Sequence, residues 1–325
     1  MRFNFCPPQN QDASFAVFCD NETMRIGPFE LLEPLPTLRE PHAIASLVPW
    51  LDAGGVGHLV LASLQQHCQA TKLGEMAKPG RFYDFTRYRP TTALRGEERV
   101  LDIPNTSVWH GRLSNGADLL FLNVLEPHLN AEEYIEGLIA LLTGLGVRRH
   151  LRVGAWYNAV PHTRPLNVSF SLAGQQIDPV TRRPIASQSR YQGPTSIMNQ
   201  LTDTLEKQGI ENAGISVQLP NYAQLDEDHT GVAAALRALM ELYPLPQSLR
   251  ITIETEAAAG VRQYRELTRS LTADAHAQSV LRQMEADYDT RRSGQTAPSP
   301  SPLSQEIEQF LDELGRGLGD DPPRQ

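Results

Sequence analysis

The sequence has few cysteines, no long apolar run and fewer basic than acidic residues. Its three cysteines, Cys6, Cys19 and Cys68, are too few and too irregularly spaced for a disulfide framework, so we expect reduced thiols. No segment approaches the roughly 18 apolar residues that a membrane-spanning helix needs. The start, MRFNFCPPQNQ, has neither the basic nor the apolar region of a signal peptide. These absences predict a cytoplasmic protein with no membrane partner.

The charge balance and the missing ligand motifs exclude two further classes of function. The net charge of -9, from 38 acidic against 29 basic residues, opposes the phosphate-neutralising surface that nucleic-acid binding requires. Nine histidines are present, but no HExxH pair and no CxxC pair occurs. We therefore expect no nucleic-acid partner and no metal.

The stretch LVPWLDAGGVGHLV, residues 47–60, resembles the glycine-rich turn of a dinucleotide-binding fold. After Gly55 and Gly57, however, the third glycine of that fingerprint is replaced by Val60, and Asp52 would repel a phosphate. The chain also lacks the Lys-Ser or Lys-Thr pair of a P-loop in this turn. The glycines are thus predicted to let a helix pack closely on a sheet, and no cofactor is expected.

Apolar runs of strand length alternate with amphipathic segments of helix length. The predicted strands are 43–50, 106–112, 118–125, 150–159, 166–174 and 214–223, with a tight turn at 114–117; the predicted helices are 56–68, 134–145 and 193–209. Asn130 and Glu133 resemble a capping box before the second helix. This alternation predicts an α/β structure with a mostly parallel sheet and helices on both sides.

After the predicted sheet, the pattern of apolar residues changes to helical spacing. Two successive helices are indicated by an apolar stripe of Ala257, Val261, Tyr264, Leu267, Ala277, Val280, Met284 and Tyr288. The run RRSGQTAPSPSP reads as an extended linker, and a short acidic amphipathic helix follows it, with Leu303, Ile307, Phe310, Leu311 and Leu314 on one face. The predicted organisation is an N-terminal extension (1–30), an α/β core (31–250), a helical hairpin (251–290), a linker (291–302), the acidic helix (303–316) and a tail (317–325).

Seven motifs along the chain carry a family resemblance. They are WLDAGGVG (50–57), FYDFTRYRP (82–90), IPNTSVWH (103–110), LEPHL (125–129), VPHTRP (160–165), SRYQGPTSI (189–197) and LPNYA (219–223). In order and spacing the chain resembles the proteasome assembly chaperone 2 family, above all its bacterial, uncharacterised members. The resemblance runs from about residue 34 to 315.

The resemblance implies a three-layer α/β/α fold like that of purine nucleoside phosphorylases and self-association into trimers or higher assemblies. It also implies protein partners, since eukaryotic members act as heterodimeric chaperones for proteasome α-subunits. Two motifs depart from the family pattern: Ser196 replaces a glycine, and Asn221 replaces a histidine in a Pro-His-Tyr segment. The second change puts in doubt any acid or base role at that position.

Several polar residues follow predicted strands, where ligands collect in α/β sheets. They are Asp52, Glu126, His162 and Arg164; the motif residues Asp84, Arg89, Thr195 and Tyr222 complete the candidate pocket. Arg164 would bind a carboxylate or phosphate, and His162 could titrate near neutrality. The alternative is a structural network, with Asp84, Arg87 and Arg89 forming internal ion pairs.

The sequence therefore favours a homo-oligomeric, assembly-chaperone-like protein that works by binding other proteins. The alternative is a small-molecule enzyme, phosphorylase-like or carboxylate-amine-ligase-like, that uses a pocket at the carboxyl ends of the strands. No GxSxG motif supports a serine hydrolase. The run Asp226, Glu227, Asp228 and His229 is interpreted as a solvated loop and a helix start rather than a metal site.

Overall fold

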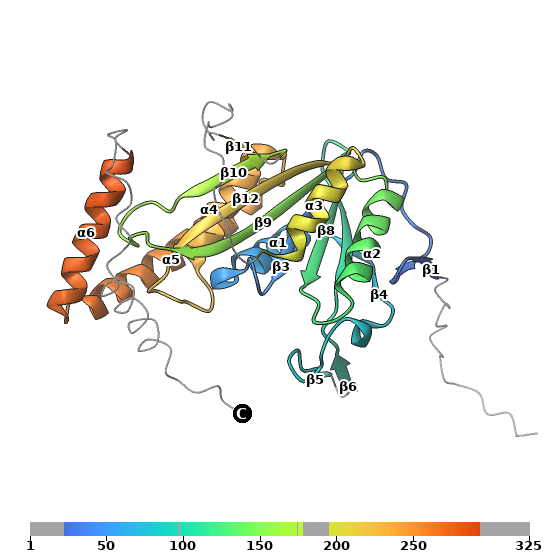
Figure 1. Cartoon of the computed structure of the whole chain (residues 1–325), viewed down its shortest axis with the longest axis horizontal. Helices are drawn as coiled ribbons and strands as arrows, with labels where there is room; N and C mark the ends of the chain where they lie inside the picture. The colour runs from blue at the N-terminus through green and yellow to red at the C-terminus, as the bar shows by residue number, and fades with distance from the viewer. Residues whose placement is uncertain (1–22, 97, 174, 178–194, 293–325) are drawn as a thin grey trace, which may run out of the picture.

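The computed structural model describes residues 23–96, 98–173, 175–177 and 195–292. The predicted acidic helix 303–316, the tail and most of the linker lie outside these residues. Figure 1 shows one large twisted sheet with helices on both faces, α6 at one end of the molecule and a small hairpin, β5–β6, projecting from its side.

Ten strands of the described residues form the large sheet, in the order β1-β2-β4-β7-β8-β3-β9-β12-β10-β11. Their bounds are β1 Thr23–Ile26, β2 Phe29–Leu32, β3 His42–Val48, β4 Thr71–Met76, β7 Ser107–Arg112, β8 Asp118–Leu125, β9 Arg149–Asn158, β10 Val168–Leu172, β11 Gln175–Ile177 and β12 Glu211–Pro220. A separate two-stranded sheet pairs β5 (Thr91–Arg95) with β6 (Glu98–Asp102).

The predicted α/β class is confirmed, but the expectation of a mostly parallel sheet is wrong. Only β8, β3, β9 and β12 run parallel to their neighbours within the sheet's centre. The flanking pairs, from β1 to β8 on one side and from β12 to β11 on the other, are antiparallel. A tight turn such as the one at 114–117 places two consecutive strands side by side in opposite directions. Parallel neighbours need a longer crossover connection, usually a helix.

Helices cover the two faces of the sheet separately. One face packs against α1 (Val56–His67), α4 (His229–Leu242) and the first turns of α5 (Leu249–Leu271), and the other packs against α2 (Ala131–Gly144) and α3 (Ile197–Lys207). Alternation along each strand divides its residues between these cores: in β3, Ile44 faces α1 while Ala43 and Leu47 face α2 and α3. The three-layer α/β/α arrangement implied by the family resemblance is thus confirmed.

The last helix, α6 (Ala275–Arg292), follows α5 after a short turn. Leu267 and Leu271 of α5 form a small third core with Ala277, Val280 and Met284 of α6. Val261, expected on the apolar stripe, is instead exposed on α5. None of the described helices combines the length and apolar composition needed to cross a bilayer.

The predicted capping box before α2 does not form. Asn130 adopts a left-handed backbone conformation (φ 52°), and its side-chain amide donates to the Arg81 carbonyl at 2.7 Å. Glu133 forms an ion pair with the Arg81 guanidinium at 2.9 Å. Both residues therefore hold the short helix η2 (Pro79–Arg81) against the start of α2.

Candidate functional site

The glycine-rich turn is occupied by protein groups rather than shaped as an open anion site. Gly54 and Gly55 adopt left-handed conformations with φ of 55° and 62°, which favours glycine at both positions. A Cβ atom on Gly57 would lie 2.9 Å from Asp52 Oδ1 and 3.1 Å from the Val153 carbonyl. This geometry supports the packing role that the sequence predicted for these glycines.

Asp52 lies at the N-terminus of α1, where backbone N–H groups attract negative charge. Its Oδ1 accepts the backbone N–H of His58 at 3.0 Å, and its Oδ2 lies 2.5 Å from His58 Nδ1. The hydrogen bond that the His58 ring donates to Asp52 raises the pKa of His58, whose ring is half-exposed. The carboxylate therefore stabilises the helix N-terminus from within the chain.

His162 and Tyr222 come into contact, but within a buried structural cluster. The Tyr222 hydroxyl accepts the His162 backbone N–H at 2.8 Å and lies 2.7 Å from its Nδ1, while Nε2 lies 2.9 Å from the Thr268 hydroxyl. Burial lowers the pKa of His162 to about 4 and raises that of Tyr222. Its pKa of about 4 keeps this histidine neutral near pH 7, and its two ring nitrogens join the loop after β9 to Tyr222 and to α5.

Arg164, two residues further on, reaches α6 instead of a cavity. Its Nε and Nη2 donate to the two carboxylate oxygens of Asp289 at 2.9 and 2.8 Å, and its Nη1 lies 3.4 Å from Glu285. Thr163 donates to Glu285 at 2.5 Å. The Pro-His-Thr-Arg-Pro segment thus fastens α6 to the body of the protein.

The remaining predicted site residues lie apart from this cluster. Asp84 accepts hydrogen bonds from the backbone and side chain of Thr86, and Arg87 lies 3.9 Å from it. Arg89 is exposed. The neighbouring motif residues Phe82 and Tyr83 are buried in the core. In this motif the aromatic side chains therefore pack in the core, and the Asp84 carboxylate holds its own loop in place.

Glu126 and Thr195 both lie near the start of α3. The Glu126 carboxylate accepts the backbone N–H of Ile197, and its burial raises its pKa. Thr195 accepts a hydrogen bond from the Asn199 side chain. Among the described residues, no hydrogen bond or ion pair joins Asp52, Glu126 and Arg164 to one another.

Two arrangements were missed by the sequence reasoning. The run 226–229 was expected to be a solvated loop and a helix start. Helix α4 does begin at His229, but Asp228 is only 1% exposed: it caps α4 by accepting the Gly231 N–H at 2.8 Å, and it also accepts the Tyr264 hydroxyl at 2.8 Å. Burial raises its pKa. The other is a cavity of about 550 Å³ beside α3, lined by Arg152 and two tryptophans, Trp50 and Trp156. No sequence motif marked Arg152, because its surroundings are set by tertiary structure.

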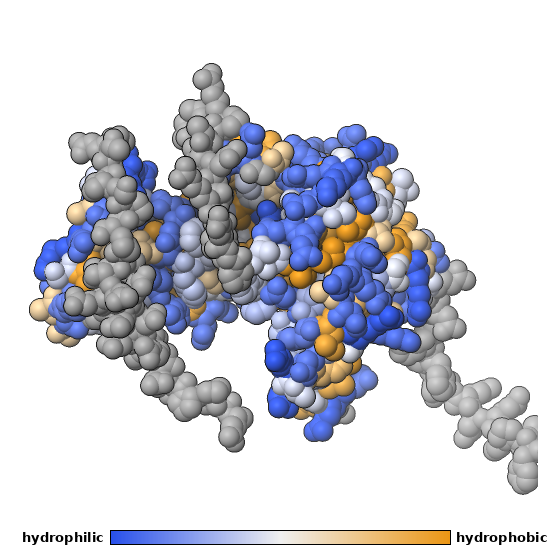
Figure 2. Space-filling model, in the orientation of Figure 1, coloured by the Kyte–Doolittle hydropathy of each residue, from blue (hydrophilic) through white to orange (hydrophobic). Residues whose placement is uncertain are grey.

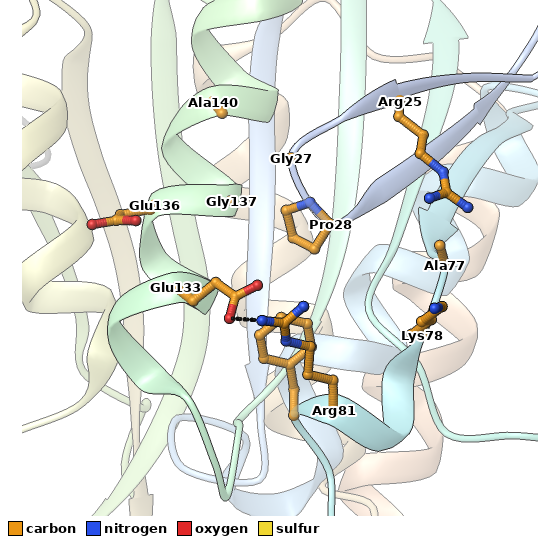
Figure 3. A pocket seen from close by; sticks show the side chains of 11 residues that line it. Arg25, Gly27, Pro28, Ala77, Lys78, Arg81, Glu133, Glu136, Gly137 and Ala140 are labelled. Carbon is orange, nitrogen blue, oxygen red and sulfur yellow. Dashed lines mark ion pairs between the residues drawn. The ribbon is translucent and has the colours of Figure 1, made fainter.

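A second, smaller cavity of about 380 Å³ lies between the β1–β2 turn and α2. Figure 3 shows Pro28 against Gly137 and the ion pair of Arg81 with Glu133 at its edge. Arg25, on its other wall, lies 3.4 Å from the Glu30 carboxylate. Within the described part of the chain, no group of three His, Cys, Asp or Glu side chains is arranged to hold a metal ion.

The fold is therefore that of a three-layer α/β/α protein. Several of its motif residues form hydrogen bonds and ion pairs that hold loops and helices together. Residues 46–268 match the sequence model of the PAC2 family. The chain therefore belongs to the PAC2 family, as the motif resemblance predicted.

Solved structures of related proteins share this fold. A Mycobacterium tuberculosis protein of unknown function is 25% identical, with 90% of this chain and 98% of that chain covered and a TM-score of 0.69. A PAC2 family protein from Streptomyces avermitilis is 24% identical (74% and 99% covered, TM-score 0.63). A proteasome-assembly chaperone homologue from Mycobacterium tuberculosis is 22% identical (74% and 99% covered, TM-score 0.62). No curated protein matches the sequence.

Proposed function

We propose that this chain is a cytoplasmic, protein-binding, assembly-chaperone-like protein that acts as a homo-oligomer. The family supports a chaperone-like role, and one structural relative is itself described as a proteasome-assembly chaperone homologue. The internal engagement of His162, Arg164 and Asp52 argues against the enzyme alternative, because these three candidates for a base, an anion ligand and an acid already have partners within the chain.

The observation that carries the proposal is the β5–β6 hairpin. Within the described parts of the chain its two strands pair only with each other, and the hairpin projects from the body of the molecule (Figure 1). Leu94 and Leu101 are 72% and 57% exposed, and Figure 2 shows hydrophobic residues gathered over this projection. A two-stranded hairpin is only marginally stable by itself in water.

The strand register places Leu94 and Leu101 on the same face of the hairpin, together with Arg99. Leu94 pairs with Arg99, and Thr92 pairs with Leu101, so these four side chains share one side. Since the two leucines are 72% and 57% exposed, covering them contributes about 2–4 kcal/mol of hydrophobic free energy. The surface thus fits a partner that has an apolar patch and a carboxylate.

We assign this surface to a second copy of the chain. With 38 acidic against 29 basic residues, a second copy supplies carboxylates for Arg99 as well as an apolar hairpin of its own. The free outer edges of β5 and β6 can also pair with another strand. A contact between the two hairpins is two-fold symmetric and gives a dimer, whereas a contact of the hairpin with a different surface of the next copy is head-to-tail and can close into a trimer or higher ring.

Sedimentation velocity of the full chain at micromolar concentration tests the proposal. We expect a mass of at least twice 36.1 kDa, and a shift to monomer in the double variant Leu94→Ser/Leu101→Ser. Ile251→Ser, at an exposed position of α5, is the matched control and should leave the mass unchanged. A monomeric native chain, or a hairpin variant that keeps the native mass, contradicts the proposal.

A further inference from the structure

The cavity beside α3 lies where this helix leaves part of the sheet uncovered. Leu151, Val153 and Ala155 of β9 face the core under α1 and α4, so the alternate residues Arg152, Gly154 and Trp156 face the opposite side. These three residues line the cavity, as do Gly214 and Ser216 of β12. Its volume of about 550 Å³ falls in the range of small-molecule sites.

The guanidinium of Arg152 is the charged group of this cavity. Its Nη1 donates to the Asn199 side chain at 2.9 Å, while its Nε is buried and has no hydrogen-bond partner. Among the described residues Arg152 forms no ion pair. Because Nε is enclosed, a ligand in the cavity can meet only the terminal nitrogens, and within the described residues Asn199 engages just one of these, Nη1. The remaining N–H groups of the guanidinium are therefore donors for an anion bound in the cavity.

The rest of the wall is partly apolar and partly hydroxylated. Trp50 and Trp156 are half-exposed at the cavity, and Leu47 and Met198 add apolar surface. Hydroxyl groups come from Ser171, Ser196 and Ser216. A flat apolar group can therefore lie against an indole ring while polar atoms of the same ligand reach Arg152 or a hydroxyl.

The charges around Arg152 favour a ligand with a single negative charge. Asp203 and Glu206 of α3 interact electrostatically with the guanidinium and reduce the positive potential in the cavity. A dianion such as a phosphate monoester would lose more hydration on entry and would meet only one cation. A carboxylate matches the planar guanidinium and carries one charge.

We propose that this cavity binds a small carboxylate with a flat apolar body, with Arg152 contacting the carboxylate and Trp50 or Trp156 contacting the body. The site is separate from the β5–β6 hairpin, so it adds a small-molecule ligand to a protein-binding function. It also differs from the pocket expected from the sequence motifs, with which it shares only Thr195.

The full chain can be titrated with 2-naphthoate and with its uncharged counterpart 2-naphthamide. Calorimetry and tryptophan fluorescence report binding, the latter because Trp50 and Trp156 line the cavity. We expect 2-naphthoate to bind with a dissociation constant of about 1 mM or tighter and 2-naphthamide to bind at least about tenfold more weakly. Equal binding of the two compounds, or no binding of 2-naphthoate, overturns the proposal.

Variants locate the binding. Arg152→Met should weaken 2-naphthoate binding by at least about tenfold and leave 2-naphthamide unaffected, whereas Arg265→Met, at an exposed position of α5, should change neither. Ser216→Leu, which narrows the cavity without a change of charge, should weaken both compounds and tests the site if Arg152→Met does not fold. Native affinity for 2-naphthoate in either cavity variant contradicts the assignment.

Discussion

Arg164 and Asp289 form a two-pronged ion pair, with Nε–Oδ1 and Nη2–Oδ2 distances of 2.9 and 2.8 Å. The pair joins the loop after β9 to α6, two elements separated by more than a hundred residues. A motif that resembled a ligand site in the sequence therefore holds a helix in place. The Tyr288 hydroxyl adds a bond of 2.7 Å to the Pro165 carbonyl in the same contact.

Removal of this pair should loosen α6 specifically. In Arg164→Ala we expect the amides of residues 275–292 to exchange hydrogen about two- to fivefold faster, because a partly exposed ion pair contributes modestly. Arg269→Ala, which removes an exposed pair with Glu266 on α5, is the control. Unchanged exchange across α6 in Arg164→Ala would show that the pair does not hold the helix.

Substitution of Gly57 should lower the free energy of unfolding and should not change the affinity for any nucleotide. In Gly57→Ala the new methyl group meets Asp52 and the Val153 carbonyl, so we expect a loss of about 1–3 kcal/mol in urea unfolding. Ser63→Ala, on the same helix, should stay within about 0.5 kcal/mol. Calorimetric titration with ATP and NAD should show no binding; micromolar binding of either that disappears in Gly57→Ala would refute the packing role.

His162 should make the protein less stable in mild acid. Its pKa is about 4 in the folded protein against 6.5 for the free side chain, so the unfolded chain takes up the proton first as the pH falls. Its contribution is complete above pH 6.5 and is lost between pH 6.5 and 4. Between pH 7 and 5 the native protein should lose about 2 kcal/mol more than His162→Gln.

Unfolding by urea at both pH values measures this difference, and groups common to both proteins cancel. His276→Gln, at an exposed position of α6, provides the control for a change of histidine content. An identical loss in the native protein and in His162→Gln would show that His162 is not held neutral by burial.

The buried carboxylate of Asp228 should matter far more than its exposed neighbour. Asp228→Ala leaves the Gly231 N–H and the Tyr264 hydroxyl without their acceptor, so we expect a loss of about 2–4 kcal/mol. Asp226→Ala, in the same acidic run but exposed, should cost less than about 0.5 kcal/mol. Similar losses for the two variants would mean that the run is solvated after all.

Local patterns were sufficient for the central elements of the fold and insufficient for their pairing. The apolar runs and helical periodicity indicated β3, α1, β8, α2 and β9 at nearly their observed positions. The direction of β4, β10 and β11 depends on which strands lie next to them, and periodicity carries no such information. For the same reason, two-stranded pairing of β5 with β6 apart from the sheet was not expected.

The candidate site was harder to predict because polar residues of one type serve different purposes. Asp52 accepts a backbone N–H in the first turn of α1, and Arg164 forms an ion pair with α6, yet both follow predicted strands, where ligand-binding residues also lie. Asp228 caps α4, and its burial depends on α5, which supplies Tyr264. Arg152 lies in a strand and follows no motif. Its place at a cavity depends on where α3 begins relative to β9 and β12, which only the folded chain determines.

Photo-crosslinking in the native cell tests the central claim, that the β5–β6 hairpin is a protein-binding surface. A photoreactive phenylalanine analogue replaces Leu94 on the hairpin or, as the control, the exposed Val261 of α5. We predict discrete products from position 94, whose mass spectra join this residue to a second copy of the chain, and none from position 261. If position 94 yields no more product than position 261, the hairpin does not bind protein and the account is contradicted.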